Sequence, residues 1–387
     1  MQAIRRLITA VFVIIAFTGN CQVPDTETFS LQDVVDEINP SSNDLITCFD
    51  ESDPAEFDSD YTPSGFDPHA TDKTGYELLY FRNYAGWEFV GYAGWNQRRS
   101  FGHAYDEAEG RLIVVGGYDG SYLRDTWYST DNGQTWTQNT STDFSEREHF
   151  KIVSDGDVII LTGGNNVSYL SELWFTGDEG AFWTKPSPQP SWVGRSHHSY
   201  DKKGSVNTTL YSIVIGGFDG NEYLNDVWMY EGLSTWTKKK DNNTSGFSKR
   251  MEHEVVVMPN GDLILIGGVD ANGRRNDVWK STDNGATWNE IKRNNSDGFS
   301  KRSAHEAVVN GNGVIFVMGG IDDNNQRLND IWVSTDGGYR WNLIGEAKWD
   351  PRNNFGAEII GNYIYVFGGD GNTQNFNDIW RLDVSDL

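Results

Sequence analysis

The sequence has few cysteines, few prolines and no apolar run that could cross a bilayer. Among its 387 residues there are 2 cysteines, Cys21 and Cys48, and 10 prolines. Both cysteines precede the patterned part of the chain, so we expect no disulfide within that part. The apolar run Leu7–Phe17 is too short to span a membrane. A fold that depends on disulfides and a transmembrane helix are therefore both disfavoured.

Positive charge is also scarce. There are 31 Lys and Arg against 56 Asp and Glu, which gives a formal net charge of −25. A surface of this charge repels phosphate backbones and anionic lipid headgroups, so the sequence predicts no nucleic-acid partner. Between Gln22 and Asp72 there are fourteen acidic residues and no Lys or Arg. With so few hydrophobic residues this stretch cannot form a core, and we interpret residues 22–75 as a disordered acidic tether.

The first 21 residues have the layout of an export signal. Arg5 and Arg6 precede the apolar run, and Cys21 follows it directly. The segment "FTGNC" resembles a lipoprotein signal with Thr18 where Leu or Val is usual, so two alternatives stay open. Cys21 is lipidated and anchors the protein in a membrane, or the protein is simply secreted. Either alternative predicts a location outside the cytoplasm, with membrane attachment only through Cys21.

A Gly-Gly pair closes an apolar run six times along the rest of the chain. The pairs recur at intervals of 47 to 53 residues, a period typical of propeller blades. They are Gly116–Gly117, Gly163–Gly164, Gly216–Gly217, Gly267–Gly268, Gly319–Gly320 and Gly368–Gly369.

Tryptophans repeat with the same period. One follows each glycine pair by ten to twelve residues, and a second follows the first five of these by eight or nine. The sixth repeat lacks the second tryptophan, whereas Trp87 lies in a matching context before the first repeat. We infer that the segment around Trp87 supplies the outer strand of the last blade and so leaves no open sheet edge.

With these motifs the chain resembles the kelch repeats of the galactose oxidase/kelch superfamily, in an exported bacterial form. The resemblance covers about residues 80–387, and we place the propeller domain at residues 76–387. It implies an all-β fold, a six-bladed β-propeller of four-stranded antiparallel blades in which an N-terminal strand closes the last blade. It does not imply one activity, because propellers of this kind include binding modules, structural proteins and enzymes.

The segment "STDNGQTW", Ser129–Trp136, resembles the Asp-box turn of sialidases. It recurs as "STDNGATW" at Ser281–Trp288 and as "STDGGYRW" at Ser334–Trp341. Asp, Asn and Gly suit a tight turn, and one copy per blade suits a structural role better than a catalytic one. We therefore interpret these segments as turns between the third and fourth strands.

Arginines and acids also repeat six times. An arginine precedes each inner strand, and an acid lies two residues before the first tryptophan of each blade. We expect each arginine to pair with one acid and stabilise the blade, while the alternative is an anion site formed by free arginines at the channel mouth. The arginines are Arg98, Arg147, Arg195, Arg250, Arg302 and Arg352, and the acids are Asp125, Glu172, Asp226, Asp277, Asp330 and Asp378.

Function is expected where the repeats differ. Three residues after each arginine, three consecutive repeats have histidine where the others have phenylalanine. These histidines either bind a ligand or fill the same core position as the phenylalanines, and we expect no metal site. Glu252, Glu254, Glu306 and His197 add polar side chains to the same sector. The predicted ligand-binding residues are Arg195, His198, Arg250, Glu252, His253, Arg302, His305 and Glu306.

The sequence thus predicts a monomeric, non-catalytic scaffold that binds a glycan or a protein and has no cofactor. A copper site with a cysteine–tyrosine crosslink is excluded within the repeats, because no cysteine follows Cys48. The alternative is a sugar-processing enzyme similar to the sialic-acid mutarotase, since such chemistry needs only a positioned acid or base beside a bound sugar. A sialidase fits less well, because the repeat accounts for every arginine of the ring.

Overall fold

The structure is a computed structural model, and its described residues begin at residue 86. All described residues belong to the unit His69–Leu387. The predicted signal peptide, the acidic tether and Cys21 lie outside the described residues. In the described part no helix is long and apolar enough to cross a membrane. The described ranges are 86–139, 143–155, 158–206, 209–231 and 236–387.

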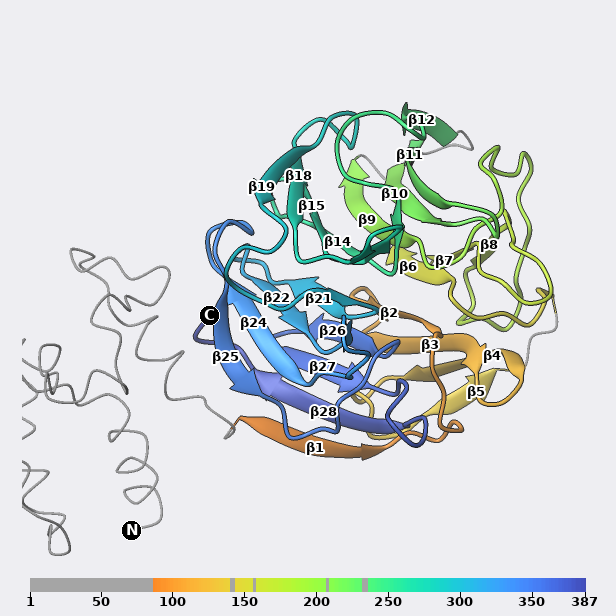
Figure 1. The fold of residues 1–387 in the computed structure, drawn as a ribbon. Coiled ribbons are helices and arrows are strands. Elements are labelled where there is room, and N and C mark those ends of the chain that lie inside the picture. The colour runs from red at the N-terminus through yellow and green to blue at the C-terminus, as the bar shows by residue number, and fades with distance from the viewer. Residues whose placement is uncertain (1–85, 140–142, 156–157, 207–208, 232–235) are drawn as a thin grey trace, which may run out of the picture. The chain divides into compact units, whose positions relative to one another are not determined.

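The strands form antiparallel sheets that are arranged as blades around a centre (Figure 1). Within the described residues, five sheets have four or more strands. Named from the inside outward, they are β2 (Gly102–Asp106), β3 (Arg111–Tyr118), β4 (Tyr122–Ser129), β5 (Thr137–Asn139); β9 (Ser199–Val206), β10 (Thr209–Phe218), β11 (Tyr223–Glu231), β12 (Trp236–Lys240); β14 (Glu254–Val257), β15 (Leu263–Ile266), β18 (Val278–Ser281), β19 (Asn289–Lys292); β21 (Glu306–Val309), β22 (Ile315–Met318), β24 (Asp330–Ser334), β25 (Asn342–Glu346); and β26 (Gly356–Ile360), β27 (Tyr363–Phe367), β28 (Asp378–Asp383), β1 (Trp87–Tyr92).

Shorter strands complete the set. A three-stranded sheet contains β6 (Lys151–Asp155), β7 (Val158–Thr162) and β8 (Leu173–Thr176). Short strands link neighbouring blades: β13 (Arg250–Met251), β16 (Val269–Asp270) and β17 (Gly273–Arg274) extend the sheet of β11, and β20 (Arg302–Ser303) pairs with β23 (Ile321–Asp322). The predicted all-β propeller is confirmed.

The inner strands follow one another around a closed ring. β2 contacts β6 and β26, and the series continues through β9, β14 and β21. Two residues before each inner strand, one residue has a positive φ of 50° to 55°. Its backbone N–H donates to the carbonyl of the equivalent residue in the preceding blade, at 2.9 to 3.0 Å. Six such bonds close a cycle through Ser100, His149, His197, Glu252, Ala304 and Asn354.

The sheet of β6–β8 has three strands where four were predicted. Its outer position is held by Thr184, which exchanges two backbone hydrogen bonds with Phe175, at 2.7 and 2.9 Å. The Gln189 side chain accepts from the Leu173 N–H at 2.9 Å. Three prolines lie within residues 186–190, and proline has no N–H to donate to a ladder. The prediction of six four-stranded blades is therefore wrong: five sheets reach four strands, and a three-stranded sheet occupies the remaining place in the ring.

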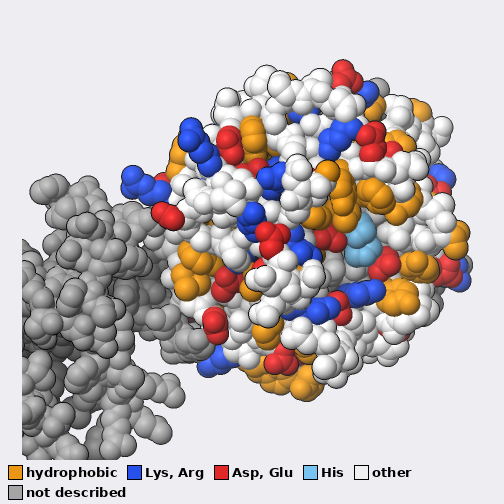
Figure 2. Space-filling model, in the orientation of Figure 1, with side chains coloured by type: hydrophobic (Ala, Val, Ile, Leu, Met, Phe, Trp, Pro, Cys, Tyr) orange, Lys and Arg blue, Asp and Glu red, His pale blue; other side chains and the backbone are white. Residues whose placement is uncertain are grey.

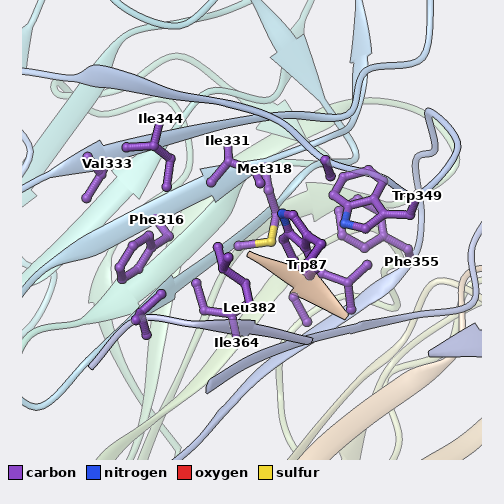
Figure 3. Packing of buried hydrophobic residues seen from close by; sticks show 14 of the residues in the cluster. Trp87, Phe316, Met318, Ile331, Val333, Ile344, Trp349, Phe355, Ile364 and Leu382 are labelled. Atoms are coloured by element: carbon purple, nitrogen blue, oxygen red, sulfur yellow. The ribbon is translucent and has the colours of Figure 1, made fainter. Parts of the chain in front are cut away.

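The N-terminal strand closes the last blade, as predicted. β1 pairs antiparallel with β28, with Trp87 opposite Leu382. The Trp87 side chain is buried, and its ring lies 5.8 Å from that of Trp349 in an edge-on arrangement. Figure 3 shows Trp87 in one apolar cluster with Met318 and Phe355. The two ends of the propeller are thus held together both by a ladder and by a shared core.

The Gly-Gly pairs lie where neighbouring blades come closest. The first glycine of each pair has φ between 55° and 62°, a region that favours glycine. A Cβ on it would lie only 2.7 to 3.1 Å from an aromatic or histidine ring of the next blade. The rings are those of Phe101, Phe150, His198, His253, His305 and Phe355. Both the backbone conformation and the close approach therefore explain why glycine recurs.

The turns that resemble the Asp-box join the third and fourth strands. In the first of them, the Asp131 carboxylate accepts hydrogen bonds from the N–H of Thr135 at 2.8 Å and from its hydroxyl at 2.6 Å. The Trp136 indole donates to the Gly133 carbonyl at 3.0 Å. The same bonds recur around Asp283, and partly around Asp336. All of these contacts are local to the turn, which agrees with a structural role.

Candidate functional site

The six repeated arginines are buried and each binds the predicted acid. The shortest distances between guanidinium nitrogen and carboxylate oxygen are 2.6 to 2.8 Å. Each arginine also donates to the carbonyl of the first glycine of its blade's Gly-Gly pair. The tryptophan two residues after each acid donates to the same carboxylate. We call these six arginine–acid–tryptophan groups the frame. The pairs are Arg98–Asp125, Arg147–Glu172, Arg195–Asp226, Arg250–Asp277, Arg302–Asp330 and Arg352–Asp378.

The frame engages four or all five guanidinium N–H donors of each arginine inside the blades. In Arg250, Nη1 donates to Asp277 and Gly267, Nη2 to Asp277 and Ser248, and Nε to the Ser248 carbonyl. Arg195 and Arg302 are equally buried and bind their own acids in the same way. These three arginines were predicted as ligand contacts, and in this structure their donors are engaged inside the blades. We leave them out of the candidate site.

The three histidines of the asymmetric sector occupy the same core position as the phenylalanines. His198, His253 and His305 are at most 1% exposed. Burial, together with the nearby frame arginines, holds the pKa of each well below its ordinary value, so the rings are neutral at neutral pH. Their rings pack between blades against the first glycine of a pair. They also line the central space.

The channel mouth carries a different pair of histidines. His149 and His197 belong to the cycle of backbone hydrogen bonds, and their rings stack with centroids 3.5 Å apart. Burial lowers the pKa of both, so two neutral rings lie face to face. The Ser196 hydroxyl lies 2.7 Å from His197 Nδ1, and a Glu252 carboxylate oxygen lies 3.7 Å from His197 Nε2. Figure 2 shows histidine near the centre of the face toward the viewer, beside acidic and hydrophobic side chains.

Below the mouth, charged side chains of the inner strands meet in the channel. Lys151 Nζ lies 2.8 Å from Glu254 Oε1 and 3.9 Å from Glu306 Oε1. On the other side, His103 Nδ1 lies 2.9 Å from Glu358 Oε1, and His103 Nε2 lies 3.5 Å from Glu306 Oε1. We call these residues and Asp201 the interior network. Its residues lie on six inner strands, β2, β6, β9, β14, β21 and β26, but their types and contacts have no sixfold symmetry.

Burial and mutual contact shift the titration of the interior network. Burial raises the pKa of Glu254 and that of Asp201 to about 7 each. Burial acts to lower the pKa of His103, but Glu306 and Glu358 outweigh it and raise that pKa to about 9. Lys151 keeps its charge, because its carboxylate neighbours raise its pKa against the effect of burial. At neutral pH the network therefore holds two cations among four carboxyl groups.

Sequence reasoning found only part of this network. Glu254 and Glu306 were named as neighbours of the histidines, but His103, Lys151 and Glu358 were missed. A signal was present, because Lys151, Glu254 and Glu306 directly follow the phenylalanine or histidine position in their repeats. The other three repeats have glycine or serine at this inner-strand position. A charged residue there could therefore have been recognised as a candidate site residue.

The mouth and the upper part of the network enclose a small space of about 50 Å³. Its lining includes the polar side chains of Lys151, Glu252, Glu254, His305 and Glu306. Such a space holds a few water molecules or a small charged group. In the described part of the chain, no group of three or more His, Cys, Asp or Glu side chains is arranged to hold a metal ion.

Aromatic loop residues lie next to the mouth. The Tyr169 and Phe218 rings are 5.6 Å apart, and those of Phe218 and Tyr223 are 5.5 Å apart. Phe218 exchanges backbone hydrogen bonds with Ser196, the residue before His197, so this aromatic cluster borders the histidine pair. Tyr169 is 38% exposed and is therefore available for contact. We call Tyr169, Phe218 and Tyr223 the loop aromatic cluster.

Ion pairs hold the loops on the opposite side of the mouth. Arg275 binds Asp270 at 2.6 Å, and Arg327 binds Asp370 of the next blade at the same distance. Arg327 also donates to the Asp370 carbonyl at 3.0 Å. Both arginines are therefore paired with acids of the loops themselves. The loops around the mouth are held in place and present little unpaired positive charge.

Comparison with known proteins agrees with this architecture. The family described as "KLHDC2/KLHL20/DRC7 Kelch-repeats domain" matches residues 102–312 and 288–387. An F-box/kelch-repeat protein of Arabidopsis thaliana is 28% identical over 217 residues, which is 50% of this chain and 43% of that protein. The leucine-zipper-like transcriptional regulator 1 homolog of Drosophila melanogaster is 28% identical over 187 residues, which is 44% of this chain and 18% of that protein.

A further relative is the tRNA wybutosine-synthesizing protein 2/3/4 of Arabidopsis thaliana, 32% identical over 124 residues, 31% of this chain and 12% of that protein. The chain thus spans less than half the length of each of these relatives, and the similarity concerns the repeats. The matched ranges cover most of the chain and include every blade. The glycine pairs, the frame and the ring of inner strands together show that this chain belongs to the kelch-repeat family.

Proposed function

We propose that this kelch propeller is a non-catalytic scaffold that binds a protein ligand at the channel mouth. The observation that carries the proposal is the loop aromatic cluster, in which exposed Tyr169 packs on half-buried Phe218, whose backbone pairs with Ser196 beside His197. Protein interfaces are enriched in aromatic side chains at their centre, surrounded by polar groups. The frame and the loop ion pairs fix this surface before a ligand binds, which lowers the entropic cost of binding.

The size of the central space favours a protein over a sugar. The space measures about 50 Å³, whereas pockets that enclose a drug-sized ligand measure roughly 300 to 1,000 Å³. A whole sugar ring does not fit in it, so a channel enzyme of the mutarotase type would need a wider space. Glycan binding at the outer loops and sugar-processing activity are retained as outcomes of the test.

The proposal includes a place for the protein. The export signal, the acidic tether and the alternative of lipidation at Cys21 suggest a monomeric propeller displayed outside the cytoplasm. Protease accessibility on intact cells tests this part. Cleavage of the full chain by an added protease, with a cytoplasmic marker left intact, is expected. Full protection of the chain would contradict an external location.

Selection from a random peptide display library on the full chain tests the binding role. We expect enriched peptides that lose at least tenfold in affinity for Tyr169→Ala and keep their affinity for Phe182→Ala. Phe182 is the matched control, because it is 72% exposed and lies in the turn between residues 176 and 183, away from the mouth. Retention of glycans on an array, together with no Tyr169-dependent peptide, would overturn the proposal in favour of a lectin.

A further inference from the structure

The central space contains more hydrogen-bond acceptors than donors. Glu306 is 7% exposed, and its Oε1 lies 3.5 Å from His103 Nε2 and 3.9 Å from Lys151 Nζ. Both separations are long for a charge-assisted hydrogen bond, which is typically about 2.7 to 2.9 Å. Glu306 therefore lies in the channel wall with capacity to accept a further donor.

His305 adds an independent indication. It is 1% exposed, lines the central space, and neither of its ring nitrogens has a hydrogen-bond partner. Its pKa lies well below the ordinary value because of burial and of Arg302, so one of these nitrogens is an acceptor at neutral pH. The buried Ser100 hydroxyl, which also lines the space, has no partner either. Both ring nitrogens of His253, which also lines the space, are without a partner as well, and buried polar atoms without partners are uncommon and call for an explanation.

The charged side chains around the space are mostly acidic. Glu252, Glu254 and Glu306 line it together with one cation, Lys151. Lys151 is held to the Glu254 side at 2.8 Å. At the rim, the His149 and His197 rings stack on each other, and burial lowers the pKa of both, so they add no positive charge to the space. A group that supplies both positive charge and several N–H donors complements this arrangement.

We propose that the channel mouth is a binding site for a primary ammonium group of the protein ligand. The ammonium enters past His149 and His197, donates to Glu306 and His305, and is attracted by Glu252. An ammonium is small enough for the space and offers three donors. This inference rests on the proposed protein-binding function and names the chemistry that the deepest contact of the ligand would have.

Small amines allow a test on the full chain without knowledge of the ligand. Ligand-observed NMR would measure binding of n-butylammonium, with butyrate and n-butanol as matched probes. We expect saturable binding of the amine alone. Equal binding of butyrate, or no binding of the amine to the unmodified protein, would overturn the proposal.

Variants then assign the site. Glu306→Gln should weaken n-butylammonium binding at least tenfold, whereas Glu290→Gln, an exposed carboxyl group on the outer strand β19, should leave it unchanged. Lys151→Gln removes the competing cation and should tighten binding. Weaker binding by Lys151→Gln would instead indicate an anion site and contradict the proposal. Unfolding midpoints of each variant show whether a loss of binding reflects a loss of fold.

Two model compounds distinguish the possible sources of the ammonium. Nα-acetyl-lysine amide presents a side-chain ammonium, and glycinamide presents a chain N-terminus. Preference for the first assigns the site to a lysine, and preference for the second to an N-terminus. If display peptides bind through Tyr169 and neither compound competes with them, the ammonium site is refuted and the proposed function is left intact. If the amines bind but no peptide depends on Tyr169, the proposed function is refuted and the ammonium site is kept.

Discussion

The frame and the interior network are both built from buried charged residues, yet they are organised in opposite ways. In the frame, each arginine meets one carboxylate at 2.6 to 2.8 Å, and the arrangement repeats in every blade. In the interior network, Glu306 faces two cations at 3.5 and 3.9 Å, and no other blade repeats the arrangement.

This difference separates stability from recognition. Six equivalent contacts suit a ring of similar blades, whereas a ligand without sixfold symmetry cannot use them all. The charged groups of the interior network are also costly to bury. They do not recur from blade to blade, so a structural role common to all blades does not explain them. The following predictions test whether the frame sustains the fold and the interior network does not.

The largest expected effect comes from breaking a frame pair. Arg250→Ala leaves Asp277 buried without its partner and should lower the free energy of unfolding by about 3–5 kcal/mol. The matched control is Arg381→Ala, which removes an ion pair with Glu88 of similar length, 2.7 Å, at an exposed position. It should cost less than about 1 kcal/mol. Urea unfolding measures both, and equal losses would contradict the special role of the frame.

Removal of the closing side chain should be the next largest effect. Trp87→Ala creates a cavity between the last blade and the preceding blade of β21–β25 and should cost about 3 kcal/mol or more. Phe89 lies in the same strand but is 46% exposed, so Phe89→Ala should cost clearly less. Chemical denaturation followed by tryptophan fluorescence compares the two. A small loss for Trp87→Ala would show that the ladder alone closes the ring.

The glycine pairs allow a test of blade contact. Gly267→Ala places a Cβ 3.0 Å from His305 Cε1 at φ +56°, and Gly337→Ala has open space at φ +76°. Both substitutions carry the strain of positive φ, of order 1 kcal/mol, so their difference isolates the contact between blades. We expect Gly267→Ala to be the more destabilising by about 1–2 kcal/mol. Thermal unfolding of the two variants measures this difference.

Stability should also depend on pH through His103. Glu306 and Glu358 raise the pKa of His103 to about 9 in the folded protein, above its ordinary value of 6.5. The folded state therefore binds the proton more tightly, and this stabilisation is complete below pH 6.5 and is lost as the pH rises through 9. His103→Gln should flatten the fall in unfolding free energy between pH 6.5 and 9. An unchanged slope would show that His103 is not charged in the network.

The repeated features could be predicted from sequence and the irregular ones could not. Spacing alone predicts the glycine pairs, the arginine–acid matching and the closure through Trp87. The six copies show which residues recur, even where one copy departs from the pattern. The outer position of the β6–β8 sheet departs from the repeat, since its prolines remove backbone donors and Gln189 takes the place of a strand. The contacts of His103 and Lys151 depend on side chains that cross the channel from different blades, and no spacing in one repeat encodes them.

The most direct test measures n-butylammonium affinity and unfolding free energy together for Glu306→Gln and Asp277→Asn. The account predicts that Glu306→Gln loses at least tenfold in affinity and loses less stability than Asp277→Asn, because His103 keeps its closer partner Glu358 at 2.9 Å. It predicts that Asp277→Asn loses several kcal/mol of stability, as expected when a buried pair loses one charge, and keeps its affinity under conditions where it is folded. The converse pattern, a Glu306→Gln variant that unfolds easily yet binds the amine normally when folded, would contradict the division between frame and interior network.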